Sequence, residues 1–289
     1  MNCYIVEGGI GKAIAFTSIV DALAEKDGGE ICVSTPYPDI FGGNPKIKWV
    51  FDSTTIPLTD QRIQDCKDII FCEPYKSNFQ KGKEHLIESY CILLGVEYKK
   101  TMRPIIYSDH VKAQSQEALK QAEIKGQYFI VQFSGGQPPM NNMQNMYQSG
   151  DPGRNYPPFF ANTIIEGLRK AYPKIEIINY TLPNEPHYEG TKKIQIPYIL
   201  YHELLKNCEG FISIDSSLQH FAMSAKARGV VIWGSTRWSQ FGYPELRNIN
   251  FHMETKWDET KFHPQNPINI MVDPNHVLET FKKIRKKEK

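Results

Sequence analysis

The sequence predicts an α/β protein made of two halves, each with a mostly parallel β-sheet covered by helices on both faces. Its 289 residues are enough for two domains of about 130 residues each. Short apolar runs alternate with longer amphipathic runs along the chain, and this alternation is typical of βαβ units. A glycine-rich turn follows the first apolar run of each half, at Gly8 and at Gly135. We therefore expect two domains of similar layout, at residues 1–124 and 125–289.

Apolar runs in the first half predict strands at residues 2–6, 30–34, 47–51 and 68–72. Helical periodicity predicts helices at about residues 13–26, 79–94 and 109–124. Ile14, Ile19, Val20 and Leu23 fall on one face of the first helix, and Gly28-Gly29 gives it a stop signal.

The second half repeats this layout. Strands are predicted at residues 128–133, 175–180, 210–214 and 230–234, and helices at 158–172, 199–206, 217–225 and 274–286. A polar stretch rich in Gly, Pro, Asn, Gln and Met separates the first strand from the first helix. Loops of this length in a compact domain are usually functional, so we expect residues 137–153 to form a lid over a ligand.

The composition excludes several classes of protein. A net charge of +2 gives no general attraction to nucleic acid or membranes. None of the six cysteines forms a CxxC pair and no His cluster accompanies them, so neither a metal site nor a cofactor is expected. Free thiols fit a reducing compartment. Since the chain begins with a strand and has no apolar stretch of about 18 residues, we expect a cytoplasmic protein without membrane insertion.

The first motif is the glycine loop at residues 6–13. A loop between a strand and a helix turns backbone N–H groups toward an anion, so Gly9 and Gly11 are candidate contacts of a phosphate or substrate. An ATP-binding P-loop would need glycine at position 6 and a hydroxyl at position 13, where this chain has Val6 and Ala13. A purely structural tight turn is the other interpretation.

The second motif spans residues 213–220, where an apolar strand ends and a helix begins. Asp215 or Ser216 can cap that helix. The same helix start suits a diphosphate, and Asp215 can accept hydrogen bonds from sugar hydroxyls. His220 lies one turn into the helix, on the face that points back toward the loop, so either a structural or a ligand-binding role is open to it.

Two further segments end strands near the same edge. Ser134, Gly135 and, after the polar stretch, Arg154 offer a backbone open to an anion and a fixed cation for it. Residues 231–236, with Thr236 at their end, are followed by residues 241–244. This pattern of a strand and a polar loop by itself indicates only a strand end near a site.

Together these segments resemble the heptosyltransferase family of GT-B glycosyltransferases, the relatives of ADP-heptose:lipopolysaccharide heptosyltransferases. Residues 215–220 match the family's Asp-Ser/Thr-Gly/Ser-x-x-His turn, and 233–236 its Gly-x-Thr loop. Residues 132–135 and 154–156 resemble the "HPGA…KxW" segment, and 11–23 the N-terminal "GDxxxxTPxxxAL". The likeness covers nearly the whole chain and is strongest from 195 to 245.

The resemblance implies two Rossmann-like domains facing each other across a cleft, an acceptor domain at 1–124 and a donor domain at 125–289. It also implies metal-independent, inverting transfer of a sugar from a nucleoside-diphosphate donor, usually an ADP-sugar. The residues carried over to the donor are Ser134 and Arg154 at the diphosphate, Asp215, Ser216, Ser217 and His220 at the sugar and phosphates, and Glu185 at the ribose.

One departure concerns the catalytic base. The family's Asp after the loop glycine, its presumed general base, is Lys12 here. A lysine ammonium is a poor proton acceptor, so we expect Lys12 to neutralise the donor diphosphate while Glu7 takes the acceptor proton. The alternative is that Glu7 merely pairs with Lys12 at the surface, and Asp39 is then the next carboxylate to consider.

Other functions stay open at this point. The acceptor can be a glycan, a protein or a modified nucleic-acid base. The chain can also be a non-catalytic nucleotide-sugar-binding relative, or an ATP-dependent enzyme that uses the first glycine loop.

Overall fold

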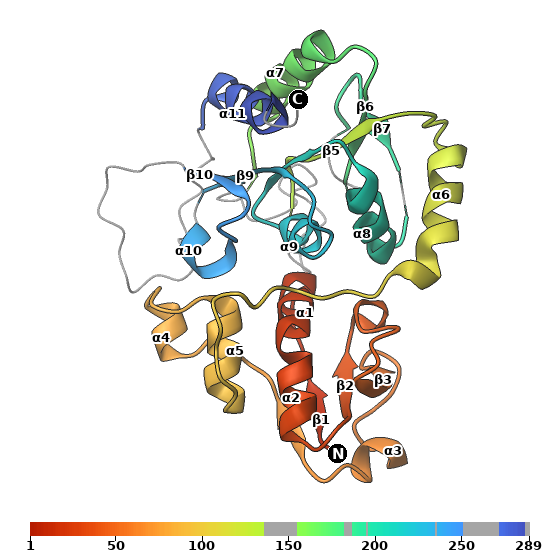
Figure 1. Ribbon diagram of the computed structural model, residues 1–289, viewed down its shortest axis with the longest axis vertical. Helices are drawn as coiled ribbons and strands as arrows, with labels where there is room; N and C mark the ends of the chain where they lie inside the picture. The colour runs from red at the N-terminus through yellow and green to blue at the C-terminus, as the bar shows by residue number, and fades with distance from the viewer. Residues whose placement is uncertain (136–154, 182–186, 195, 235, 251–271, 287–289) are drawn as a thin grey trace, which may run out of the picture. The chain divides into compact units, whose positions relative to one another are not determined.

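The computed structural model describes residues 1–135, 155–181, 187–194, 196–234, 236–250 and 272–286 (Figure 1). The chain divides into two compact units, Met1–His110 and Val111–Lys289. This division falls before the expected boundary, which lay between residues 124 and 125. Helix α6 (Lys112–Gln121) packs against α8 (Tyr198–Asn207) of the second unit. The Lys192 ammonium also binds the Ala122 and Glu123 carbonyls just beyond α6. Periodicity predicts that this helix exists but not which sheet it joins.

The first unit is built on a parallel sheet in the order β3-β2-β1-β4. Its strands are β1 (Cys3–Ile5), β2 (Ile31–Thr35), β3 (Ile47–Asp52) and β4 (Ile69–Phe71). Cys3 and Ile5 of β1 lie in a buried cluster with Cys32, Phe51 and Ile63. Burial raises the pKa of the Cys3 thiol to about 12, so this cysteine behaves as a small neutral core residue.

Two of the helices predicted for this unit are each divided into shorter parts. The first is interrupted: α1 (Ile10–Phe16) and α2 (Val20–Lys26) are separated by the short η1 (Thr17–Ile19). Here the Thr17 hydroxyl donates to the Ile14 carbonyl at 2.7 Å and competes with the regular ladder. The segment predicted at 79–94 is also divided, with a turn at 82 between its parts. The remaining helices of the unit are η2 (Pro38–Ile40), α3 (Gln61–Gln64), α4 (Ser77–Gln80), α5 (Leu86–Leu94) and η3 (Asp109–Val111), which ends in the second unit.

The second unit contains a parallel sheet in the order β10-β9-β8-β5-β6-β7. Its strands are β5 (Tyr128–Gln132), β6 (Glu176–Asn179), β7 (Lys192–Lys193), β8 (Phe211–Ile214), β9 (Gly229–Trp233) and β10 (Arg247–Asn250). Its other helices are α7 (Pro158–Ala171), α9 (Ser217–Ser224), α10 (Trp238–Phe241) and α11 (Pro274–Lys286). The predicted α/β class, with parallel sheets and a C-terminal helix, is confirmed.

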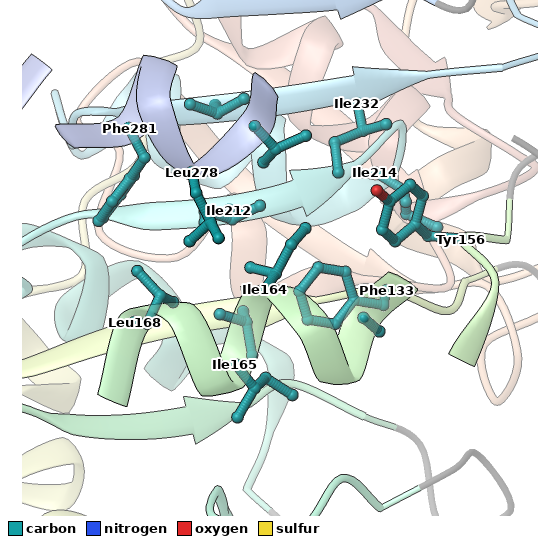
Figure 2. Close-up of a cluster of buried hydrophobic side chains, with 14 of the residues drawn as sticks. Phe133, Tyr156, Ile164, Ile165, Leu168, Ile212, Ile214, Ile232, Leu278 and Phe281 are labelled. Atoms are coloured by element: carbon teal, nitrogen blue, oxygen red, sulfur yellow. The ribbon is translucent and has the colours of Figure 1, made fainter. Parts of the chain in front are cut away.

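Helices α7 and α11 pack on each other and on one face of this sheet. On α7 the buried residues Ala161, Ile164, Ile165 and Leu168 follow the spacing of one helical face. Figure 2 shows Leu168 of α7 and the α11 side chains Leu278 and Phe281 gathered around Ile212 of β8. A Cβ at Gly167 would lie 2.3 Å from Leu278, so glycine at this position permits the close approach of the two helices.

We predict that Phe281→Ala destabilises the second unit by about 3–5 kcal/mol, the range for truncating a buried aromatic residue. Phe281 is buried and its ring packs edge-on against Phe129 at 5.2 Å. Urea denaturation followed by tryptophan fluorescence measures the change. The matched control is Phe159→Ala, because Phe159 is 77% exposed, and its effect should stay within about 0.5 kcal/mol. Equal losses in both variants would contradict the packing of α11 described here.

Candidate functional site

The sheet of the second unit reverses its strand order beside β5. From β5 the chain builds β6 and β7 on one side, then returns to place β8, β9 and β10 on the other. In such sheets the crevice at the carboxyl ends of the two strands flanking the reversal is the usual ligand site. Ser134 and Gly135 follow β5, Asp215 and Ser216 follow β8, and Thr236 follows β9. The residues that the sequence analysis selected therefore end three neighbouring strands.

Ser216 is the N-cap of α9, which settles the choice between Asp215 and Ser216. Its backbone is extended, and its hydroxyl accepts the N–H of Leu218 at 3.2 Å. The same hydroxyl donates to the side-chain carbonyl of Gln132, the last residue of β5. This bond joins the end of β5 to the residue that begins α9 after β8. The sequence analysis missed Gln132, although a polar residue at the end of an otherwise apolar run was a usable signal.

Asp215 links the ends of β8 and β9. Its carboxylate accepts a hydrogen bond from the Thr236 hydroxyl at 2.6 Å, and its side chain is buried. A buried carboxylate needs such partners, because an unpaired one is costly to remove from water. Ser217, the first residue of α9, is half-buried.

His220 is buried within a polar cluster. Its Nδ1 lies 2.9 Å from the Tyr243 hydroxyl, and its Nε2 lies 3.2 Å from Nε2 of Gln219. Gln219 also donates to the Phe241 carbonyl at 2.9 Å. These bonds hold the segment after α10 onto α9. His220 thus has a clear structural role. Gln219 and Tyr243 belong to the motif segments but were given no role from the sequence, and Tyr243 reaches His220 only in the fold.

The turn after β5 is held from its other side. The backbone N–H of Gly135 donates to Oδ1 of Asn155 at 3.0 Å, and Ser134 is buried. Asn155 was not selected from the sequence as a contact. Arg154, Glu185 and the expected lid at 137–153 lie outside the described residues.

A second polar edge occurs in the first unit. Its strand order also reverses beside the first strand, because β2 and β3 lie on one side of β1 and β4 on the other. The glycine loop follows β1, where Gly8 has a positive φ of 99° that favours glycine. Gly9 precedes α1 and Gly11 lies in its first turn. Glu7 is exposed on this loop.

Tyr37, beyond the end of β2, faces the same loop. Burial raises the pKa of Tyr37, an N–H of Ile10 lowers it, and the Glu7 carboxylate raises it. The phenol therefore lies close to both the helix start and Glu7.

Lys12 has a different partner from the expected one. Its ammonium contacts both carboxylate oxygens of Glu73, at 3.0 and 2.8 Å, and lies 3.9 Å from the centroid of the Tyr75 ring. The Lys12 side chain is 10% exposed and that of Glu73 56%. The alternative in which Glu7 pairs with Lys12 is wrong: β4 lies beside β1 and carries Glu73 to this position.

Two hollows in the described structure lie elsewhere. One of about 600 Å³ is lined by Arg169, Tyr172 and Lys192, and one of about 450 Å³ by Asn162, Glu166 and His187. Both follow α7 and the segments before β6 and β7 rather than the carboxyl ends of the strands. Among the residues that the structure describes, there is no cluster of His, Cys, Asp and Glu that could hold a metal ion. Nor does any helix among the placed residues have the length and apolar character to cross a membrane.

We predict that Ser216→Ala destabilises the protein by about 0.5–2 kcal/mol, the cost of losing a helix N-cap, because α9 loses its cap and Gln132 loses its partner. The change is measured as a shift of the urea midpoint. Ser217→Ala, one residue further on, is the control and should change stability by no more than about 0.5 kcal/mol. If Ser217→Ala costs as much as Ser216→Ala, Ser216 is not the cap that matters.

Comparisons by sequence find nothing, since no protein-family model and no curated protein matches the chain. Solved structures do match. The glycosyl transferase family 9 protein from Veillonella parvula DSM 2008 has a TM-score of 0.72 at 10% identity, covering 99% of this chain and 97% of that one. The ADP-heptose LPS heptosyltransferase II of E. coli has a TM-score of 0.69 at 12% identity, covering 100% and 99%.

The dodecameric iron-containing heptosyltransferase TibC of enterotoxigenic E. coli, solved with ADP-D-β-D-heptose, is also similar. Its TM-score is 0.62 at 14% identity, and the match covers 99% of this chain and 73% of that one. Identities this low establish the fold alone. The chain therefore has the α/β fold shared by these family 9 glycosyltransferases and heptosyltransferases.

Proposed function

We propose that this protein is a glycosyltransferase that moves a sugar from a nucleoside-diphosphate donor, with an ADP-sugar favoured, to an acceptor hydroxyl. The observation that carries the proposal is the convergence of Ser134, Gly135, Asp215, Ser216 and Thr236 at the strand reversal of the second unit. That crevice is where α/β sheets bind nucleotides. The fold is one found in glycosyltransferases.

The chemistry of this edge suits a diphosphate sugar. The start of α9 presents N–H groups and partial positive charge, and Ser216 and Ser217 carry hydroxyls. Asp215, already fixed by Thr236, can accept from sugar hydroxyls. We assign Arg154 to the diphosphate, Glu185 to the ribose and His220 to the lining of the donor site. One similar structure contains ADP-D-β-D-heptose, which supports the preference for ADP.

The transfer step needs a proton acceptor. The acceptor oxygen attacks the anomeric carbon, the bond from that carbon to the diphosphate oxygen breaks, and the hydroxyl proton passes to a base. Inversion follows from a single displacement. No metal is required in this scheme, because Arg154 and the helix start supply positive charge. We propose that a carboxylate at the reversal of the first sheet takes the proton. Glu7 is the one that the sequence singled out.

The acceptor is a glycan, a protein or a modified nucleic-acid base. The free cysteines of the described structure suit the reducing cytoplasm in which we place the reaction. The second candidate is a non-catalytic nucleotide-sugar-binding protein. The observation in its favour is Lys12, which stands where the resembling family has its base. Release of ADP from a bound donor distinguishes the two.

We predict that one class of nucleotide sugar raises the melting temperature of the full chain in a screen of ADP-, UDP-, GDP- and CMP-sugars, and that the class is ADP. A ligand at 100 times its Kd adds about 2.7 kcal/mol of stability. Arg154→Ala should weaken donor binding by about 1.5–3 kcal/mol, the range for a hydrogen bond to a charged group. Arg169→Ala, an exposed arginine on α7, should leave it unchanged. If no nucleotide sugar shifts the melting temperature, the proposed function is wrong.

A further inference from the structure

We infer that Glu73, held in place by Lys12, is the carboxylate that accepts the proton of the attacking hydroxyl. This inference rests on the proposed function and deepens it. Lys12 is then a positioning residue, and the ion pair on this edge is part of the transfer site rather than a surface ion pair without a role in the reaction.

Topology places Glu73 where a ligand is expected. β1 and β4 are parallel neighbours, with Ile5 opposite Phe71, and they flank the strand reversal of the first sheet. Glu73 lies two residues beyond the end of β4, and the glycine loop lies directly beyond β1. Crevices at such reversals take ligands in open α/β sheets. Glu73 therefore occupies a position in the first sheet that corresponds to the position of Asp215 in the second sheet.

Lys12 is committed to holding this carboxylate. Its ammonium makes two contacts to Glu73 and lies over the Tyr75 ring, which is itself stacked on Phe79 at 4.8 Å. Its side chain is almost completely covered. The Lys12 carbonyl also accepts from the Tyr90 hydroxyl at 3.4 Å. A lysine held by a bidentate ion pair and an aromatic ring is costly to redirect toward another anion.

The Glu73 carboxylate is fixed but still able to accept a hydrogen bond. Its Oε1 accepts from Lys12 and from the backbone N–H of Tyr75 at 2.9 Å. Its Oε2 accepts from Lys12 at 2.8 Å, and a carboxylate oxygen has two lone pairs. More than half of the side chain is open to solvent. An incoming hydroxyl can thus donate to Oε2 without disturbing the ion pair.

Glu7 is less well prepared for the same task. It is exposed on the glycine loop, and among the described residues no hydrogen bond or ion pair fixes its side chain. A base must be held within a fraction of an ångström of the reacting proton to contribute fully. The resemblance places a carboxylate at position 12. In this chain position 12 carries a cation, and Glu73, two residues beyond the end of β4, supplies the carboxylate.

The proposed step is balanced. The acceptor oxygen forms its bond to the anomeric carbon as its proton moves to Oε2 of Glu73. The bond between the anomeric carbon and the diphosphate oxygen breaks, and its electron pair stays on the departing nucleoside diphosphate. The Glu73 carboxylic acid then returns its proton to solvent. With water as the acceptor, the same step hydrolyses the donor.

The test uses the full chain with ADP-heptose, water as acceptor, and ADP release as the readout. Glu73→Gln should lower kcat about 10²–10⁴-fold, the usual share of general-base catalysis, while the thermal shift produced by ADP-heptose stays as in the wild type. Lys12→Met should lower kcat by less, since the carboxylate remains but is no longer held. The matched control is Glu117→Gln: Glu117 on α6 is 55% exposed and pairs with Lys120, and its loss should leave kcat unchanged.

Wild-type turnover in Glu73→Gln would overturn the inference, and so would a full loss in Glu7→Gln with none in Glu73→Gln. A melting curve of each variant without ligand shows whether it is folded, and Glu73→Asp, which keeps the carboxylate, should retain more activity than Glu73→Gln. If the wild type neither binds ADP-heptose nor releases ADP, the proposed function fails first and takes this inference with it. If the wild type binds ADP-heptose and Glu73→Gln keeps full activity, only the role of Glu73 is refuted and the proposed function stands.

Discussion

The reversal of strand order beside the first strand of each sheet is the constraint on which the rest of the structure depends. In a parallel sheet every strand ends at the same edge, and a reversal separates the loops of the two flanking strands. In the second unit the reversal lies between β5 and β8, and in the first between β1 and β4. Near each reversal, polar or charged side chains contact each other, Gln132 and Ser216 in the second unit and Lys12 and Glu73 in the first. The residues assigned to donor and acceptor chemistry are therefore where they are because of strand order.

In the second unit, helix packing on one face of the sheet supports the polar residues at the strand ends. In the second unit α11 returns from the end of the chain to cover the sheet beside α7. The Tyr156 hydroxyl donates to the Val272 carbonyl at 2.6 Å, which joins the entries to the two helices. Such a core lets the Gln132–Ser216 and Asp215–Thr236 bonds hold one geometry, and a site preorganised in this way has less to reorganise when a ligand binds.

Much of the fold could be predicted from the sequence, because buried parallel strands appear as short apolar runs, as β5 and β8 do. The two edge strands of the second sheet were missed for a physical reason. β7 is only Lys192–Lys193, and β10 reads Arg-Asn-Ile-Asn, so neither has an apolar run. The polar edge of the first sheet was predicted only in part. Lys12 stood out by position, but its partner Glu73 is 61 residues away, just beyond the end of β4. Gln132 and Tyr243 likewise acquire meaning only from contacts between elements distant in sequence.

The central claim is that a nucleotide sugar binds at the strand reversal of the second unit. Hydrogen–deuterium exchange of the full chain, with and without ADP-heptose, tests it most directly. The account predicts slower exchange in the segments that follow β5, β8 and β9, at residues 133–135, 215–220 and 233–236, because their N–H groups and caps face the ligand. Protection confined to the hollow beside Arg169 and Lys192, or no protection at saturating ADP-heptose, would contradict it.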